Sequence, residues 1–314
     1  MTPQQLRSAH RAAPPCHHCG LGKAHRASRK SISSTPRSCA FGEKLHADLE
    51  EIPRSFGGKS HALFVVDDLS RYCWVRFLSR KSDAAAELLD VVSLINSYYP
   101  TTVAGGSTVQ VLRTDSGGEF KSHALRHSLS NLNSLLSREC STAGCSAFAN
   151  GVVERMIRTV TESARTSSLA MGAPPAALAE SVRHSVHLHN RLPTKSNPNS
   201  APPVKVAFPS EKPLNMEHLR PFYAPVYVTK LPRELPRRNK ADPRAFYGRF
   251  LGFTPGYKGY RVLVNGKVLH RADVFFDECS NGGHVPPPEF HDPVDPILSI
   301  PDATPSGPPA HREF

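Results

Sequence analysis

The sequence predicts an α/β core followed by a smaller β-rich unit. Short apolar runs between residues 44 and 78 are typical of strands. Two later segments, 83–99 and 150–168, place apolar residues at helical spacing. Apolar runs on both sides of Asn265-Gly266 have the signature of a β-hairpin. Strands and helices in this order favour a sheet flanked by helices, with an antiparallel β-unit after it.

The core elements follow one another simply along the chain. Strands at 44–49, 61–70 and 71–78 are expected to be antiparallel, with a tight turn between the last two. The helix over 83–99 follows Ser82 and has four apolar residues on one face: Leu88, Val91, Val92 and Ile95. The remaining predicted elements are a strand at 109–113, a helix near 119–131, a weak strand around 134–140 and a long helix over 150–168.

Composition limits the classes of function. The chain has 314 residues, with 39 Lys and Arg against 27 Asp and Glu, so its net charge is +12. This excess favours a polyanionic partner such as nucleic acid, although an ordinary basic soluble protein is the alternative. No segment resembles a signal peptide or a membrane span, so we expect an intracellular protein without a membrane partner. Seven irregularly spaced cysteines indicate reduced thiols.

Composition also divides the chain into four regions. Residues 1–40 are basic and poor in large apolar residues, which predicts a tail or a small metal-dependent module, partly disordered. Residues 44–200 hold the strongest periodic signals and form the predicted core. Residues 201–280 contain a proline-punctuated linker and then the β-rich unit. Residues 281–314 are rich in proline, so we expect a disordered tail.

Two aspartates are expected at strand ends, where functional groups gather in open α/β sheets. Asp115 follows a short apolar strand and precedes Gly117 and Gly118, although such a segment is also typical of a simple turn. Asp48 stands in the same way at the end of the first strand, and the two strands are candidates to lie side by side.

The long helix offers a third carboxylate. An apolar stripe is formed by Val153, Met156, Ile157, Val160 and Ala164. The opposite side carries Glu154, Arg155, Arg158, Glu162 and Arg165. Glu154 and Arg158 also fit an ordinary surface ion pair. Crowded carboxylates repel one another, so a site built from Asp48, Asp115 and Glu154 would need divalent cations, and oxygen ligands favour magnesium or manganese.

Ordered sequence blocks over residues 44–280 resemble the integrases of copia-type retrotransposons, in the ribonuclease H-like retroviral integrase superfamily. The blocks include LHADL, FVVDDLSRYCWVRFLSRKSD, VLRTDSGGEF, NGVVERMIRTVTESAR, LHNRLPT and FYGRFLGFTPGYKGYRVLVNGKVLHRADVFFDE. The resemblance implies a ribonuclease H-like mixed five-stranded sheet. It also implies that Asp48, Asp115 and Glu154 form the catalytic acidic triad and hold two Mg²⁺ or Mn²⁺ ions.

The function implied by this resemblance is DNA integration by an integrase segment of a polyprotein. The activity would be 3′-end processing and strand transfer on DNA, performed by a homo-oligomer in the nucleus. Lys121, Arg155 and Arg158 are candidates for phosphate contacts, and solvated surface charge is the alternative for each. The basic run at 230–240 is a candidate to follow a DNA backbone, or else a solvated linker.

Three departures from the family pattern support a second reading, a catalytically decayed nucleic-acid-binding remnant. The stretch SAFAN before Gly151 lacks the family's proline and glutamine. The 38 residues between Asp115 and Glu154 exceed the family's usual spacing, and EEIP replaces the glycine-proline pair expected after the first aspartate. A ribonuclease H-type nuclease shares the acidic site, but the blocks after residue 200 disfavour it.

Other polar clusters are expected to have structural roles. Cys16 and Cys19 form one CxxC pair, typical of half a zinc site, and His25 follows it. The upstream histidines of the family's zinc module are missing, so an unoccupied remnant is favoured over bound zinc. Packing or surface roles are favoured over metal binding for the helical histidines His184, His187 and His189. Asp67 and Asp68 are interpreted as strand-end or turn residues.

Overall fold

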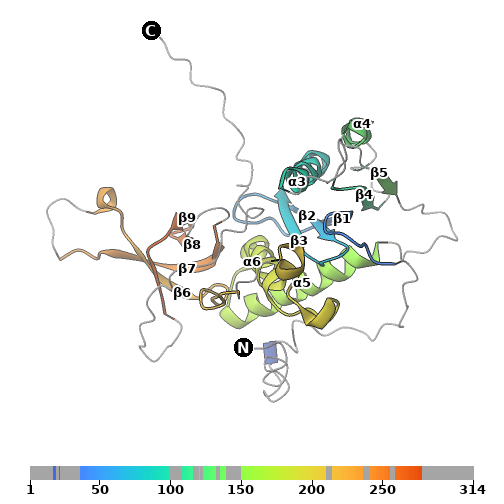
Figure 1. The fold of residues 1–314 in the computed structure, drawn as a ribbon. Helices are drawn as coiled ribbons and strands as arrows, with labels where there is room; N and C mark the ends of the chain where they lie inside the picture. Colours follow the sequence, from blue (N-terminus) through green and yellow to red (C-terminus); the bar gives the residue numbers. More distant parts are fainter. Residues whose placement is uncertain are drawn as a thin grey trace, which may run out of the picture.

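The computed structural model contains two five-stranded sheets, the second formed by later residues than the first. Figure 1 shows the two sheets beside each other. It describes residues 17, 18, 21, 36–98, 108–115, 120, 123–131, 135–138, 150–209, 214–235, 241–254 and 259–277. The predictions for Cys16, Cys19, Lys121 and the tail at 281–314 lie outside these residues. In the described part of the chain, no helix is long and apolar enough to cross a membrane.

The first sheet is mixed and has the order β3-β2-β1-β4-β5. β1 (Lys44–Glu51), β2 (His61–Asp67) and β3 (Cys73–Leu78) are antiparallel neighbours, which confirms the three predicted strands. β4 (Val111–Thr114) pairs in parallel with β1, and β5 (Leu135–Arg138) pairs in parallel with β4. Parallel strands need a crossover, and helices α3 (Ala84–Tyr98) and α4 (His123–Asn131) lie in the two connections.

Helices cover both faces of this sheet (Figure 1). On one face, α3 buries the predicted apolar stripe against the strands, with Leu88, Val91, Val92 and Ile95 all inaccessible to solvent. On the other face lie α5 (Gly151–Met171) and α6 (Leu178–Arg191). The predicted stripe of α5 is confirmed, because Val153 through Ala164 at helical spacing are buried there. The helical spacing of apolar residues in the sequence therefore predicted the buried faces of both helices correctly.

Short helical segments complete the chain. α7 (Pro203–Ala207) lies just beyond the expected core region, yet it packs Val204 and Ala207 into the same cluster as α3. The 3₁₀ segments are Lys81–Asp83, Pro175–Ala177, Pro198–Ser200 and Pro232–Glu234. The packing of α7 shows that the connector to the second sheet begins after this helix.

The second sheet is antiparallel throughout and has the order β10-β6-β7-β8-β9. Its strands are β6 (Pro225–Thr229), β7 (Ala245–Phe253), β8 (Tyr260–Val264), β9 (Lys267–Arg271) and β10 (Val274–Phe276). The predicted hairpin is confirmed: Asn265 and Gly266 have φ of 49° and 74°, which a type I′ turn requires at both positions.

The two sheets meet at α6. Glu180 of α6 accepts hydrogen bonds from both Nε and Nη2 of Arg261 on β8, at 3.1 and 2.5 Å. His184 is buried and packs its ring against Phe250 and Phe253 of β7. His187 stacks on Phe253 with ring centroids 4.2 Å apart. These contacts confirm packing roles for His184 and His187.

Asp67 and Asp68 fasten the segment before β1 to the sheet. Asp67 accepts hydrogen bonds from the backbone of Gly42 and from both the backbone and hydroxyl of Ser70. Asp68 accepts from Ser38, Lys44, His46 and Arg71. Burial alone would raise the pKa of Asp68, but the hydrogen bonds from His46 and Ser38 and the charge of Arg71 lower it. Both aspartates therefore have the structural role predicted for them.

Candidate active site

Asp48 and Asp115 directly follow paired positions on two neighbouring parallel strands. Ala47 of β1 is in register with Thr114 of β4, and each is followed by one of the two aspartates. Neighbouring strands lie about 4.8 Å apart, so this register brings the two residues to one place in the sheet. β1 runs on to Glu51, whereas the sequence predicted its end near Asp48, because its pairing with β2 continues after the pairing with β4 stops.

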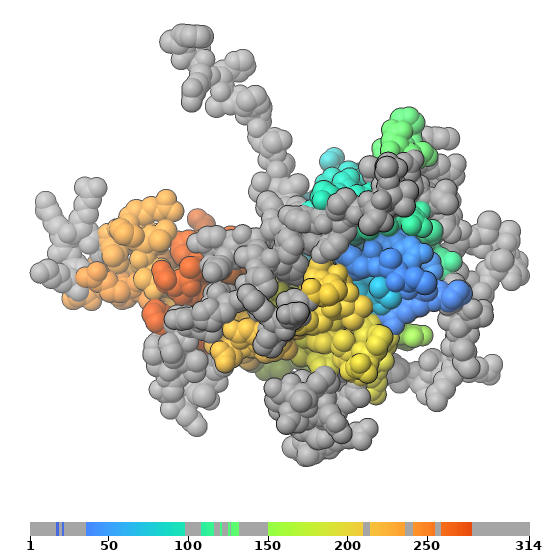
Figure 2. Space-filling model, in the orientation of Figure 1, coloured from blue at the N-terminus to red at the C-terminus, as the bar shows by residue number. Residues whose placement is uncertain are grey.

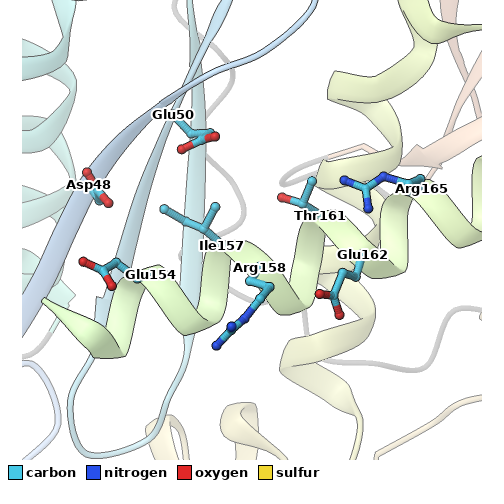
Figure 3. Close-up of a pocket in the computed structure, with 8 residues that line it drawn as sticks. All are labelled: Asp48, Glu50, Glu154, Ile157, Arg158, Thr161, Glu162 and Arg165. Carbon is cyan, nitrogen blue, oxygen red and sulfur yellow. The ribbon is translucent and has the colours of Figure 1, made fainter. Parts of the chain in front are cut away.

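Glu154 reaches the same place from the first turn of α5. Figure 3 shows the carboxylates of Glu154 and Asp48 turned toward one another, one from the helix and one from β1. The helix start is fixed by Asn150, which is 2 % exposed and whose side-chain amide donates to the carbonyl of Ala47 at 3.1 Å. The helix dipole favours a negative charge in this first turn. This hydrogen bond joins the beginning of α5 to the strand position beside Asp48.

The electrostatics of Asp48 indicate crowded negative charge. Burial is the largest cause that raises its pKa to about 6, and the charges of Asp115, Glu50 and Glu154 contribute to the same rise, while a hydrogen bond from the Leu49 amide opposes it. A site of this kind gains stability from a cation that neutralises it.

An open groove of about 300 Å³ extends from the two carboxylates along α5. Its lining residues are Asp48, Glu50, Glu154, Ile157, Arg158, Thr161, Glu162 and Arg165 (Figure 3). The helical members recur at intervals of three and four residues, so they form one face of α5 over about 16 Å. Asp48, Glu50 and Glu154 lie at the end near β1, and Arg158 and Arg165 lie farther along the helix, with Glu162 between them in the sequence. This arrangement suits a ligand with several phosphate groups.

The oxygen donors fit a hard divalent cation, but they are not assembled around one. Among the described residues, no three His, Cys, Asp or Glu side chains lie together in a metal-holding arrangement. We expected Asp48, Asp115 and Glu154 to converge within metal-bridging reach, and the structure instead brings them to neighbouring positions. Like charges repel, so closer approach of these carboxylates requires a counter-charge between them.

The remaining predicted residues divide between the groove and its surroundings. Arg158 lines the groove, with its guanidinium pointing away from Asp48 in Figure 3. Arg155 is exposed on the same helix but does not line the groove. Sequence reasoning missed Arg165 as a groove residue, although its spacing of eleven residues from Glu154 places both on one helical face. It also missed the contact of Asn150, for which no local pattern exists.

Comparison with known proteins shows that the sequence is similar to retroelement sequences. Residues 224–289 match the family described as retroviral polymerase SH3-like domain. The chain is 28% identical over 273 residues to the retrovirus-related Pol polyprotein from transposon TNT 1-94 of Nicotiana tabacum. It is 26% identical over 278 residues to the transposon Ty1-PR2 Gag-Pol polyprotein of Saccharomyces cerevisiae. The chain is a distant homologue of Pol polyproteins.

The matched region is most of this chain but only a small part of each relative. Each match covers 84% of this chain, but only 19% of the tobacco polyprotein and 15% of the yeast polyprotein. A third relative, the retrovirus-related Pol polyprotein from transposon RE2 of Arabidopsis thaliana, is 24% identical and is covered to 17%. The chain therefore spans less than a fifth of the length of the curated relatives it matches. The second sheet accounts for most of the SH3-like match, since β6 to β10 lie within it.

Proposed function

We propose that the chain is the integrase region of a copia-type retrotransposon polyprotein, with a ribonuclease H-like core followed by the SH3-like unit. The observation that carries this proposal is the register of β1 and β4, which sets Asp48 beside Asp115, with Glu154 facing Asp48 across the groove. Homology to Pol polyproteins over 84% of the chain supports the same conclusion. The activity would be 3′-end processing and strand transfer on DNA, carried out in the nucleus by an oligomer bound to DNA.

The proposed chemistry is phosphoryl transfer, which asks the protein mainly for positioning and charge neutralisation. Asp48, Asp115 and Glu154 would hold two Mg²⁺ or Mn²⁺ ions. When bound, such a pair supplies an activated water or 3′ hydroxyl and neutralises charge on the leaving oxygen. β1, β4 and α5 orient the three carboxylates, and Asn150 fixes the position of α5 relative to β1. Arg158 and Arg165 would contact phosphates along the strand leaving the site.

The experiment is a disintegration assay on a branched DNA substrate with Mn²⁺, comparing the wild type with Asp115→Asn. Asp115→Asn keeps the size of the side chain and removes its charge, so activity should fall to background. Glu162→Gln is the matched control, because it removes a groove carboxylate outside the triad and should keep most of the activity. Equal activity of the wild type and Asp115→Asn would contradict the proposal.

A catalytically decayed, DNA-binding remnant is the second candidate. It is favoured by the absence of a three-ligand arrangement among the described residues and by the altered SAFAN stretch before α5. The same assay separates the two candidates. A protein that binds DNA but shows only background activity, whether or not Asp115 is replaced, would support the remnant.

A further inference from the structure

The described residues cover only part of one face of the second sheet. One face is buried in the cluster around Val226, Phe250 and Val262. Side chains alternate along strands, so the neighbouring residues point to the opposite face. There, Leu251 of β7 packs with Phe222 at the junction with the first core. Farther along the same face, on β6 and β7, the structure places exposed aromatic rings instead.

These rings form a continuous strip with one arginine, the tyrosine strip of Tyr223, Tyr227, Tyr247 and Arg249. Tyr227 and Tyr247 face each other in the β6–β7 register with ring centroids 5.6 Å apart, and they are 45% and 54% exposed. The guanidinium of Arg249 lies 5.7 Å from the ring of Tyr247 and 5.4 Å from that of Tyr223. The other exposed large apolar side chains among the described residues, Leu21, Phe56, Leu169 and Leu192, stand on different elements.

We propose that the tyrosine strip binds single-stranded nucleic acid by stacking unpaired bases on Tyr227 and Tyr247. Aromatic side chains held on a sheet offer flat surfaces to bases of any sequence, and a neighbouring arginine adds a cation for the phosphates. The strip lies in the second sheet, whereas the acidic groove lies between β1 and α5 of the first. The strip is thus a second contact for nucleic acid, outside the site of the proposed chemistry.

Charge favours nucleic acid over a protein partner, although tyrosine and arginine are also common in protein interfaces. The chain carries a net charge of +12. Across the strands, the residues next to the pair of tyrosines are Asp277, which follows β10, then Pro225 of β6 and then Arg249 of β7. The acid stands at one end of this row and the arginine at the other. The phosphates are therefore expected along the Arg249 side, over β7, with the bases directed toward Tyr247 and Tyr227.

The position of β6 and β7 suits such a partner. Figure 1 shows these strands extending away from the first sheet and its helices, and Figure 2 shows their orange surface on the side of the molecule far from the core. A strand bound there would lie on paired strands, because Tyr227 of β6 is in register with Tyr247 of β7 on one side and with Phe275 of β10 on the other. Rigid rings lose little conformational entropy on binding.

The test compares two probes of equal length and charge on the full chain. Fluorescence anisotropy measures the affinity for oligothymidine of about 15 nucleotides and for an abasic oligomer of the same length, at one salt concentration. The wild type should bind the base-carrying probe about tenfold more tightly. The double variant Tyr227→Ala with Tyr247→Ala should reduce this ratio to near one and leave the affinity for duplex DNA within about twofold.

Two further variants separate stacking from loss of folding or of catalysis. Tyr227→Phe with Tyr247→Phe keeps the rings and should keep the ratio, as should Leu192→Ala, which removes an exposed apolar side chain elsewhere. Asp115→Asn should keep the ratio even though it ends the proposed catalysis, so failure of one proposal is distinguishable from failure of the other. Equal wild-type binding of both probes would overturn the proposal. A changed sedimentation coefficient of the Ala variant with an unchanged ratio would also overturn it and assign the strip to a second copy.

Discussion

The side-chain amide of Asn150 donates a hydrogen bond to the backbone carbonyl of Ala47 across 103 residues of sequence. Ala47 precedes Asp48 and is in register with Thr114, which precedes Asp115. Asn150 precedes α5, whose first turn carries Glu154. This one contact therefore connects the three elements that carry the candidate triad.

Asn150→Asp is predicted to destabilise the protein and to lower activity. The substitution keeps the shape of the side chain but removes the donor to the Ala47 carbonyl and adds a negative charge beside three others. We expect a loss of about 2 kcal/mol in the free energy of unfolding, measured with urea. Asn199→Asp is the control, because Asn199 is exposed and should tolerate the same change within about 0.5 kcal/mol. Equal losses in the two variants would contradict the role of the contact.

Asp48→Asn is predicted to stabilise the protein without added metal at neutral pH. The pKa of Asp48 is raised to about 6 by burial and then by Asp115, Glu50 and Glu154, so the folded state binds a proton more tightly than the unfolded state. Its contribution to stability is therefore present at about pH 4 and is lost as the pH rises through 6. Since Asp48 is partly exposed, we expect the variant to gain about 1 kcal/mol near pH 7.5 and nothing near pH 4. Urea unfolding with a chelator at both pH values measures this difference, and an equal effect at both would contradict it.

The arginines of the groove are predicted to contact DNA phosphates. Replacing both Arg158 and Arg165 by alanine should weaken duplex binding and make the slope of log affinity against log salt shallower by about two. Arg155→Ala is the comparison, because Arg155 is exposed on the same helix but does not line the groove. Anisotropy titrations at several salt concentrations provide the slopes. If Arg155→Ala alone changed the slope as much as the double variant, the groove would not be the path of the DNA.

The ion pair between Glu180 and Arg261 is predicted to hold the two sheets together. Both side chains are largely buried, so Glu180→Gln leaves the guanidinium of Arg261 without its charge partner, close to Arg183. We expect a loss of about 3 kcal/mol and faster proteolysis between the units. Asp83→Asn breaks the exposed pair with Arg80 and should change stability by less than about 0.5 kcal/mol. Similar effects of the two substitutions would show that burial of the pair is unimportant.

Much of the fold was predictable because its signals are local. The apolar stripes of α3 and α5 predicted which face of each helix is buried, and Asn265-Gly266 predicted the turn between β8 and β9. The adjacency of β1 and β4 was one of several pairings that the strand pattern allowed. The pairing of β10 with β6, and the packing of α7 in the first core, depend on distant residues and had no local signature.

The candidate site was predictable to a smaller extent. Asp48, Asp115 and Glu154 were singled out by their places at strand ends and on a helix, and by the resemblance to integrases. The direction of the groove depends on which face of α5 meets β1, and this followed only from the packed structure. The contact between Asn150 and Ala47 and the pairing of Tyr227 with Tyr247 are tertiary, so sequence periodicity contains no record of them.

Anomalous diffraction from crystals grown with Mn²⁺ tests the central claim most directly. We expect two peaks in the space bounded by Asp48, Asp115 and Glu154, within coordination distance of their carboxylate oxygens, and we expect the peaks to disappear in the Asp115→Asn variant. Anomalous peaks only at other positions would contradict the assignment of these three residues as a metal-dependent catalytic centre. A wild-type site that stays empty at saturating Mn²⁺, while DNA still binds, would also contradict it.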